Sequence, residues 1–352
     1  MYLNAIGTAV PHQRYTKSEC WAAFADSAWF ERLDGRSRAI AKLVLTRDNG
    51  IEARRLAIDS IEEAFAIDAD TLHRRFALHA PSLAAASGRT ALARAAIEAR
   101  AIDAVVVTTC TGYLCPGLTS YVIERLGLRR DVLAFDLVGQ GCGGALPNWQ
   151  LASALLDCGQ CEHVLSVCVE VCSAAMYLDD DPGVLISACL FGDGAGAAVL
   201  SRKRPSGSRS IEWKQTVSVT NPAQREALRF QQRGGLLRNV LTRAVPGLAA
   251  EHADEAFRSA LTRAAVQPNE ISGWILHAGG RDVLAALATR FELDPHALRY
   301  SREALREYGN LSSAFVYFVL EAALADEAPG GWWWMSSFGA GFTCHGALLA
   351  VQ

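Results

Sequence analysis

The sequence predicts an α/β protein built from two related halves. Short apolar runs that suit buried strands alternate with segments of helical periodicity, and this alternation occurs twice along the chain. Between the two series lies RKRPSGSRS at residues 202–210, a basic stretch with Pro, Gly and Ser that is typical of a linker. We therefore expect an N-terminal half over residues 1–201 and a C-terminal half over residues 210–352.

The expected elements of the N-terminal half alternate from the first residues onward. They are a strand at 3–10, helices at 17–45, 57–77 and 81–101, a strand at 104–109, a helix at 119–127, a strand at 132–138, a helix from about 145, and strands at 164–171 and 197–200. In the C-terminal half we expect a strand at 217–219, a helix at 248–265, a strand at 271–277, helices at 281–291 and 312–325, and strands at 332–338 and 346–351.

Composition excludes several classes of function. The chain of 352 residues is 51% hydrophobic and 20% charged, which is typical of a folded protein with a large core. A net charge of −3 argues against non-specific nucleic-acid binding. The first residues lack the pattern of a signal peptide, and no apolar run is long enough to suggest a membrane span. Most of the ten cysteines lie in apolar runs, so we expect reduced thiols and a cytoplasmic protein.

Two short motifs could indicate a metal but lack partners. Cys158 and Cys161 form a single C-x-x-C without a second pair at zinc spacing. The three carboxylates of Asp179–Asp181 precede Pro182 and Gly183, which indicates a turn. We expect neither a metal nor a redox cofactor.

The segment Val132–Cys158 contains the strongest candidate for chemistry. A short apolar run is followed by glycines at 139, 141, 143 and 144 around Cys142, and then by helical periodicity. Cys142 is therefore expected on a tight turn at a helix N-terminus, where backbone N–H groups favour the nucleophilic thiolate. Two alternatives remain open: the glycines also match the dinucleotide fingerprint G-x-G-x-x-G, and a free cysteine is often a buried structural residue.

Two further turns carry polar residues at the ends of expected elements. His277 lies at the carboxyl end of an apolar strand before two glycines, and Asn310 lies just before a helix. Taken alone, a strand-end histidine is more often structural, and an asparagine before a helix is usually its N-cap. Together with Cys142 they form a nucleophilic Cys, His and Asn set.

Two other stretches have both a simple and a functional explanation. The basic residues between Arg36 and Arg55 can be a solvated helix face, or a landing site for phosphates or an acidic carrier protein. The loop Cys110–Gly117 is unusually apolar, so we expect a ligand or a partner chain to cover it.

These motifs resemble the type III polyketide synthases, the branch of the thiolase superfamily that is similar to chalcone synthase. The matching pieces follow the expected order over essentially the whole chain: GQGCGGALP around Cys142, LFGDGAGA from Leu190, HAGGRDVL from His277, GNLSSAFVYFVLE from Gly309 and SFGAGFT from Ser337. The resemblance implies a thiolase-like fold whose two related α/β halves form αβαβα layers.

The resemblance also implies roles for individual residues. Cys142 corresponds to the acyl-accepting nucleophile, and His277 and Asn310 to the pair that binds the thioester carbonyl during decarboxylation. Phe191 corresponds to a gatekeeper between the pantetheine tunnel and the cavity, and Cys115 to a residue that reaches into the partner subunit's cavity. Cavity-lining positions correspond to Cys110, Thr111, Cys172 and Ala175, and the loop of the cavity floor to Gly339, Ala340 and Gly341.

The sequence departs from the family pattern at two places. Asn239 occupies the position of a second gatekeeper phenylalanine. In ungapped register, Glu62, Phe65 and Ala69 occupy the basic positions that hold CoA phosphates in the plant enzymes. The thioester donor can therefore be CoA or an acyl carrier protein.

The implied activity is acyl transfer to Cys142 followed by decarboxylative Claisen condensation with malonyl-type thioesters. The resemblance implies a homodimer that needs no cofactor beyond its thioester substrates. Two alternatives are a single-condensation ketosynthase that joins two acyl chains and a non-catalytic thiolase-fold partner subunit. The starter, the number of extensions and the mode of release depend on cavity shape, which sequence does not give.

Overall fold

A nine-stranded mixed sheet runs through the centre of the protein. The computed structural model describes residues 1–205 and 209–352. In these residues the order of strands across the sheet is β11-β12-β13-β8-β1-β7-β6-β4-β5. Two smaller sheets pair β2 with β3 and β9 with β10.

The strands are β1 (Tyr2–Ala9), β2 (Arg14–Thr16), β3 (Ala53–Arg55), β4 (Ala104–Thr108), β5 (Leu133–Leu137), β6 (His163–Glu170), β7 (Gly194–Ser201), β8 (Ile211–Thr220), β9 (Leu228–Arg233), β10 (Leu236–Leu241), β11 (Ile271–Leu276), β12 (Gly331–Gly339) and β13 (Thr343–Val351). The α-helices are α1 (Lys17–Ala25), α2 (Ala28–Arg32), α3 (Gly35–Thr46), α4 (Ala69–Ala95), α5 (Leu118–Leu126), α6 (Ala145–Asp157), α7 (Pro182–Leu190), α8 (Val245–Ala264), α9 (Arg281–Phe291), α10 (Arg299–Tyr308) and α11 (Phe315–Ala325).

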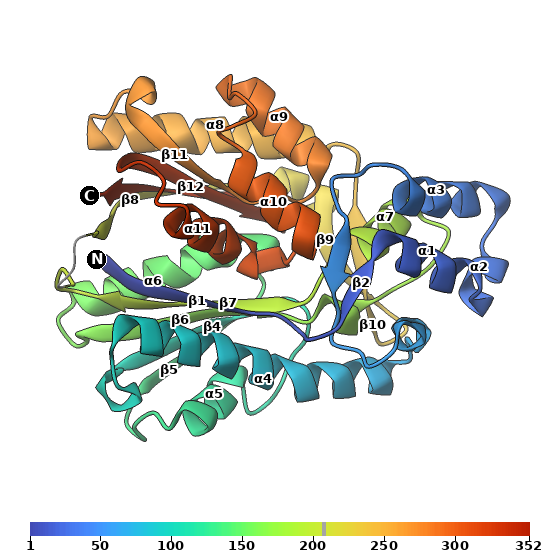
Figure 1. Cartoon of the computed structure of the whole chain (residues 1–352), viewed down its shortest axis with the longest axis horizontal. Helices are drawn as coiled ribbons and strands as arrows, with labels where there is room; N and C mark the ends of the chain where they lie inside the picture. The colour runs from blue at the N-terminus through green and yellow to red at the C-terminus, as the bar shows by residue number, and fades with distance from the viewer. Residues whose placement is uncertain (206–208) are drawn as a thin grey trace.

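The elements stack in the five layers that were expected. Figure 1 shows α8 and α9 on one outer face, α6 and α11 between the two groups of strands, and α4 with α5 on the other outer face. A narrow seam joins the two groups, because β1 and β8 pair only at Tyr2 with Glu212 and Leu3 with Ile211. The division at residues 201 and 210 stays a prediction, and residues 206–208 of the expected linker lie outside the described residues.

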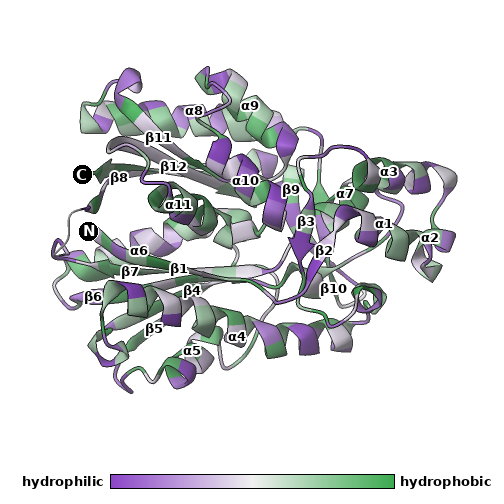
Figure 2. Cartoon of the chain, in the orientation of Figure 1, coloured by the Kyte–Doolittle hydropathy of each residue, from purple (hydrophilic) through white to green (hydrophobic). Residues whose placement is uncertain are grey.

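Burial explains why the central strands are apolar along their whole length. Every residue of β4 and β7 is buried, as expected for strands covered by helices on both faces. Trp333 and Trp334 of β12 are fully buried, and Phe257 of α8 packs edge-on against Trp334. Figure 2 shows the same pattern as apolar colouring along the inner strands and mixed colouring on the outer helices.

The N-terminal helices differ from the sequence prediction. Residues 17–45 form three helices rather than one, because the side chains of Thr16, Ser27 and Asp34 each cap a new helix start. The helices expected at 57–77 and 81–101 are instead the single helix α4, which continues through Pro81. Pro81 is buried in α4, a helix that packs on β1 and β7, so tertiary packing outweighs the loss of one backbone hydrogen bond.

Strand β5 was predicted correctly in position but not in burial. It forms one end of the sheet, pairs only with β4, and is largely exposed in the single chain. Leu133 is 38%, Phe135 36% and Val138 57% exposed. An apolar edge strand of this kind is normally covered.

The length and apolarity of a helix determine whether it could cross a membrane. Within residues 1–205 and 209–352, none of the helices combines the length and apolarity that a bilayer crossing requires.

Candidate active site

Cys142 lies in the short 3-10 helix η3 (Gly141–Gly143), which leads directly into α6. The glycines around it are required by close contact with another segment of the chain. A Cβ on Gly141 would lie 2.9 Å from the backbone N of Ala340, and one on Gly339 would lie 2.2 Å from the carbonyl O of Gln140. The chain's own segment at 339–340 therefore fills the space beside this turn, where the fingerprint alternative expected a pyrophosphate.

The side chains of His277 and Asn310 meet in the interior. Both residues are buried, and His277 Nε2 lies 3.2 Å from Asn310 Oδ1. The backbone N–H of Ser312 donates to the same Asn310 oxygen at 2.9 Å, which identifies that atom as the acceptor. His277 must then carry its proton on Nε2. The two residues thus present one imidazole N–H and one amide NH₂ group.

Ser312 connects this pair to the nucleophile. Its hydroxyl lies 3.2 Å from Cys142 Sγ, while its backbone N–H binds Asn310. Ser312 belongs to the short 3-10 helix η7 (Ser312–Ala314) and has a φ of +52°, a left-handed conformation that is uncommon outside glycine. Three segments far apart in sequence are therefore joined through one residue that sequence analysis did not single out.

The protonation states differ in part from the sequence prediction. Burial raises the pKa of Cys142 to about 12, and the nearby Glu170 carboxylate adds to the increase, while the Ser312 hydroxyl opposes it. Burial thus favours the thiol at rest, in contrast to the expected thiolate, because desolvation outweighs the helix terminus. Burial lowers the pKa of His277 to about 4, so its imidazole is neutral at pH 7.

Asn310 also differs from its simplest expected role. It is not the N-cap of α11, because its side chain instead accepts from the N–H of Ser312 two residues ahead and from His277. Its amide N–H donates to the carbonyl O of Gly279 at 3.3 Å. The amide is thus placed by three contacts.

Glu170 is a second residue that the sequence analysis missed. It is fully buried at the end of β6 and accepts hydrogen bonds from Cys110 N at 3.0 Å and Thr111 Oγ1 at 2.9 Å. The hydroxyl of Ser313 also donates to it, and the Ser312 oxygen lies 3.3 Å from the same carboxylate. Burial raises the pKa of this carboxyl. A lone Glu at the end of an otherwise apolar strand was the signal that could have identified it.

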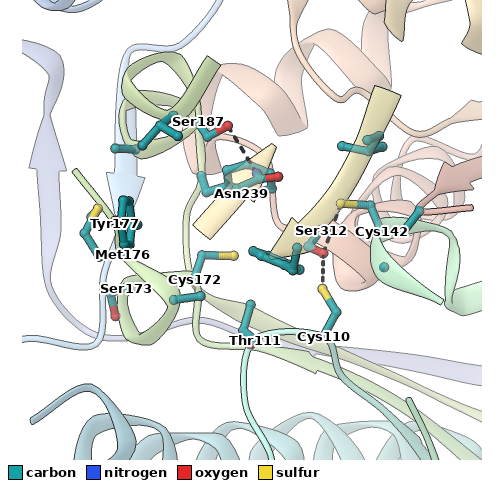
Figure 3. A pocket seen from close by; sticks show the side chains of 18 of the residues that line it. Cys110, Thr111, Cys142, Cys172, Ser173, Met176, Tyr177, Ser187, Asn239 and Ser312 are labelled. Carbon is teal, nitrogen blue, oxygen red and sulfur yellow. Dashed lines mark hydrogen bonds between the residues drawn. The ribbon is translucent and has the colours of Figure 1, made fainter. Parts of the chain in front are cut away.

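A cavity of about 60 Å³ opens beside Cys142 (Figure 3). Most of the residues expected to line it do so: Cys110, Thr111, Cys172, Ala175, Phe191, Asn239 and Ala340. Gly339 and Gly341 do not line it, which corrects that expectation, since Gly339 packs against the Cys142 turn instead. Cys115 is exposed on the surface and does not line the cavity of its own chain.

The small hairpin β9–β10 supplies part of the cavity wall and was not predicted. Gly234 and Gly235 both have positive φ at its turn, the geometry that a Gly-Gly pair between two strands favours. Phe230 of β9 and Asn239 of β10 face the cavity, and Asn239 bonds Ser187 of α7. The Gly-Gly pair at 234–235 was the available signal.

Two of the three carboxylates in the expected turn, Asp179 and Asp181, belong to this same region. Asp181 caps the N-terminus of α7, and Arg238 of β10 binds Asp179 at 2.9 Å and Asp181 at 3.0 Å. They therefore fix the hairpin to α7. Across the described ranges, no three His, Cys, Asp or Glu side chains group as a metal site would require, and all ten cysteines are free.

The basic run divides into structural and exposed residues. Arg54 is buried and donates to the carbonyl oxygens of Ala188 at 2.7 Å and Phe191 at 3.1 Å, so it holds the end of α7. On α3, Arg36, Lys42 and Arg47, the last at its C-cap, are exposed.

Two models of known protein families match this chain. Residues 80–232 match the family model described as FAE1/Type III polyketide synthase-like protein, and residues 216–351 match that of the chalcone and stilbene synthases, C-terminal domain.

Individual relatives match over nearly the whole chain. A 1,3,6,8-tetrahydroxynaphthalene synthase of Streptomyces peucetius subsp. caesius is 32% identical over 98% of this chain and 92% of its own. A 3,5-dihydroxyphenylacetyl-CoA synthase of Streptomyces toyocaensis is 26% identical over 98% and 88%. The crystal structure of the tetrahydroxynaphthalene synthase of Streptomyces coelicolor A3(2), a bacterial type III polyketide synthase, superimposes with a TM-score of 0.88 at 25% identity, covering 100% and 99% of the two chains.

Proposed function

Because the chain belongs to the type III polyketide synthases, we propose that Cys142, His277 and Asn310 carry out its decarboxylative Claisen condensation. The observation that carries this assignment is the junction at Ser312, whose hydroxyl contacts Cys142 and whose N–H contacts Asn310. His277 completes the set through its contact with the same amide. Enzymes of this family need no cofactor beyond their thioester substrates.

Loading is an acyl transfer to sulfur. The Cys142 sulfur attacks the acyl thioester, a new C–S bond forms, and the departing thiol takes the proton of Cys142. The Ser312 hydroxyl, 3.2 Å from the sulfur, stabilises the negative charge that develops there during attack. Because Cys142 begins as a thiol, this hydrogen bond supports the step in which the proton is lost.

Decarboxylation places charge on a thioester oxygen. When CO₂ leaves a malonyl thioester, the electron pair of the broken C–C bond forms an enolate. The His277 Nε2–H and an Asn310 N–H are the donors that can hold its oxygen in this buried site. Since His277 is neutral, it donates without giving up its proton. The enolate carbon then attacks the acyl carbonyl on Cys142, and the sulfur leaves.

Product analysis tests this function. Purified protein is incubated with malonyl-CoA labelled with ¹³C and a panel of acyl-CoAs, and products are identified by mass spectrometry, with Cys142→Ala as control. Products that contain two or more labelled two-carbon units support iterative condensation. A single unit identifies a single-condensation ketosynthase, and neither product nor CO₂ identifies a non-catalytic subunit.

We also propose that the protein is a homodimer that pairs through β5. Three apolar residues of this edge are at least one third exposed: Leu133, Phe135 and Val138. Tyr113 in the apolar loop before α5 is exposed as well, and Cys115 lies in the same loop. A second copy would cover both features, and sedimentation velocity at micromolar concentration tests for it.

The proposed thioester donor is CoA, bound by the exposed cations of α3. This helix packs on α7, whose residues Val184, Ser187 and Ala188 line the cavity, so α3 lies beside the cavity wall. CoA phosphates are strongly attracted to such cations, and the attraction is screened by salt. A KM for acyl-CoA that rises with ionic strength supports CoA, whereas turnover only with an acyl carrier protein would reject it.

A further inference from the structure

The side-chain amide of Asn239 faces the cavity. The protein uses only part of the hydrogen-bonding capacity of this amide. Its Nδ2 donates to Ser187 Oγ at 3.1 Å, and the Ser187 hydroxyl donates to the carbonyl O of Gly183 at 2.8 Å. Because the only hydrogen of Ser187 is committed to Gly183, its oxygen can only accept from Asn239. The NH₂ group must therefore face Ser187, and the carbonyl oxygen must face away.

The Asn239 oxygen points into the site. Figure 3 shows it directed away from Ser187, toward the side of the cavity that holds Ser312 and Cys142. Asn239 is largely buried, and the hydrogen bond to Ser187 is the one its side chain makes within the described residues, while its oxygen stays accessible from the cavity. One of its N–H groups is also free. The cavity wall thus offers one acceptor and one donor from a single amide.

Apart from the hydroxyl of Tyr177, the other polar side chains of the cavity wall are engaged within the described residues of the protein. Thr111 bonds Glu170, Ser173 bonds Asp193, Arg229 bonds Glu226, and Ser312 bonds both Cys142 and Glu170. Most of the remaining lining is apolar or sulfur-containing. An occupant without hydrogen-bonding groups would leave the Asn239 carbonyl desolvated, which is unfavourable.

The position of Asn239 relates it to the reacting thioester. Ser187 lies four residues before Phe191, the C-cap residue of α7, a separation of about 6 Å along the helix axis. Phe191 forms a backbone bridge with Asn310, and Asn239 lines the same cavity as Cys142. A group several bonds from the thioester carbonyl is therefore within its reach.

The unpaired oxygen requires a donor from the substrate. A ketone or thioester carbonyl offers only acceptors, so an acyl or polyketone chain cannot satisfy it in its keto form. A secondary amide offers both an N–H and a C=O, in the arrangement that pairs with a primary amide. The pantetheine arm of every acyl thioester in this reaction carries such an amide close to the sulfur.

We propose that Asn239 is a specificity-determining residue that pairs with the amide nearest the sulfur in the pantetheine arm of the substrate. This inference rests on the proposed function. Ser187 acts as a positioning residue, because it fixes which end of the Asn239 amide faces the cavity. The position where a gatekeeper phenylalanine was expected thus becomes a polar contact for the thioester arm.

Two thioesters that differ only in this amide test the inference. The first is hexanoyl-N-acetylcysteamine, and the second is S-pentyl hexanethioate, in which methylene groups replace the amide. The second-order rate of acylation of Cys142 is measured for each by intact-protein mass spectrometry, in the wild type, Asn239→Leu, Ser187→Ala and Val240→Leu. Val240 is adjacent on β10 and does not line the cavity, so its variant is the matched control.

The expected result is a loss confined to the amide substrate. Asn239→Leu should acylate about 5- to 100-fold more slowly with the N-acetylcysteamine thioester, as expected for two net hydrogen bonds, and within about twofold of wild type with S-pentyl hexanethioate. Ser187→Ala should show a smaller loss in the same direction, and Val240→Leu none. The rate with the amide-free thioester also shows that each variant is folded.

Two results would overturn the inference. An unchanged ratio of the two rates in Asn239→Leu removes the amide contact, and an unchanged ratio with altered product length assigns Asn239 to the acyl chain instead. If wild-type Cys142 accepts an acyl group from neither thioester nor from acyl-CoA, the proposed function itself fails, and the inference fails with it.

Discussion

Replacing Asn310 with Ala should separate decarboxylation from loading. The change removes an N–H that can hold the enolate oxygen, and loss of one such donor typically lowers the rate by about 10²–10³. Loading should be much less affected, because a reactive thioester attacked by sulfur depends less on one donor. The variant should therefore acquire an acyl group on Cys142 and release little CO₂ from malonyl-CoA.

The structure also gives the cost in stability. Asn310→Ala leaves the Ser312 N–H and the His277 Nε2–H without an acceptor in the interior. At about 1–3 kcal/mol for each buried unsatisfied donor, the loss is roughly 2–6 kcal/mol. This exceeds the cost of about 1 kcal/mol expected for a lost helix N-cap. A fall in Tm of several degrees is thus expected whether or not Asn310 is catalytic.

Asn310→Asp is therefore the informative companion variant. Its carboxylate keeps the oxygen that accepts from Ser312 and His277 but lacks the N–H. Acylation by intact-protein mass spectrometry, CO₂ release and Tm are measured on both variants. If Asn310→Asp restores stability but not CO₂ release, the amide N–H is the catalytic feature. Normal CO₂ release from either variant would remove Asn310 from the reaction.

Four further expectations concern single residues. Cys142→Ala should acquire no acyl group in intact-protein mass spectrometry, and an adduct that persists would move the nucleophile elsewhere. Because burial raises the pKa of Cys142, the thiol form prevails at pH 7, and its alkylation by iodoacetamide should accelerate about tenfold per pH unit from pH 7 to 10; a plateau below pH 8 would show a thiolate at rest. Phe135→Glu should sediment as a monomer with an unchanged far-UV spectrum, and a dimer would exclude β5 as the interface. Phe230→Ala enlarges the cavity and should add two-carbon units to the products; identical products would show that Phe230 does not limit chain length.

Sequence patterns were sufficient where a segment is buried in a regular way. The strands at 104–109 and 164–171 and the helix at 281–291 were placed within one residue of their bounds, because periodicity and continuous apolarity report burial directly. The boundaries failed where local caps decide them, as at Ser27 and Asp34. The burial of β5 was predicted wrongly, because an apolar strand has the same sequence pattern whether helices or a second chain cover it.

The residues of the site were easier to predict than its connections. Cys142, His277 and Asn310 lie in motifs next to glycine, and such motifs are visible in a sequence. Glu170 lies in no such motif, and the position of Ser312 within GNLSSAFVYFVLE does not reveal its role, because both roles arise only from contacts between distant segments. The same is true of Asn239, whose free carbonyl becomes apparent only once the hydrogen bond of Ser187 is known.

The protonation states of Cys142 and His277 could not be predicted from the sequence of the turns alone. Both depend on burial, and burial affects loading and decarboxylation in opposite ways. The burial that makes His277 a neutral donor, with a pKa of about 4, strengthens its hydrogen bond to a developing enolate. The same burial raises the pKa of Cys142 and so weakens the nucleophile that loading requires. One environment cannot favour both steps, since loading needs charge on sulfur and decarboxylation needs a dry site. Ser312 partly offsets this conflict, because its hydroxyl is the contact that lowers the pKa of Cys142 without admitting water.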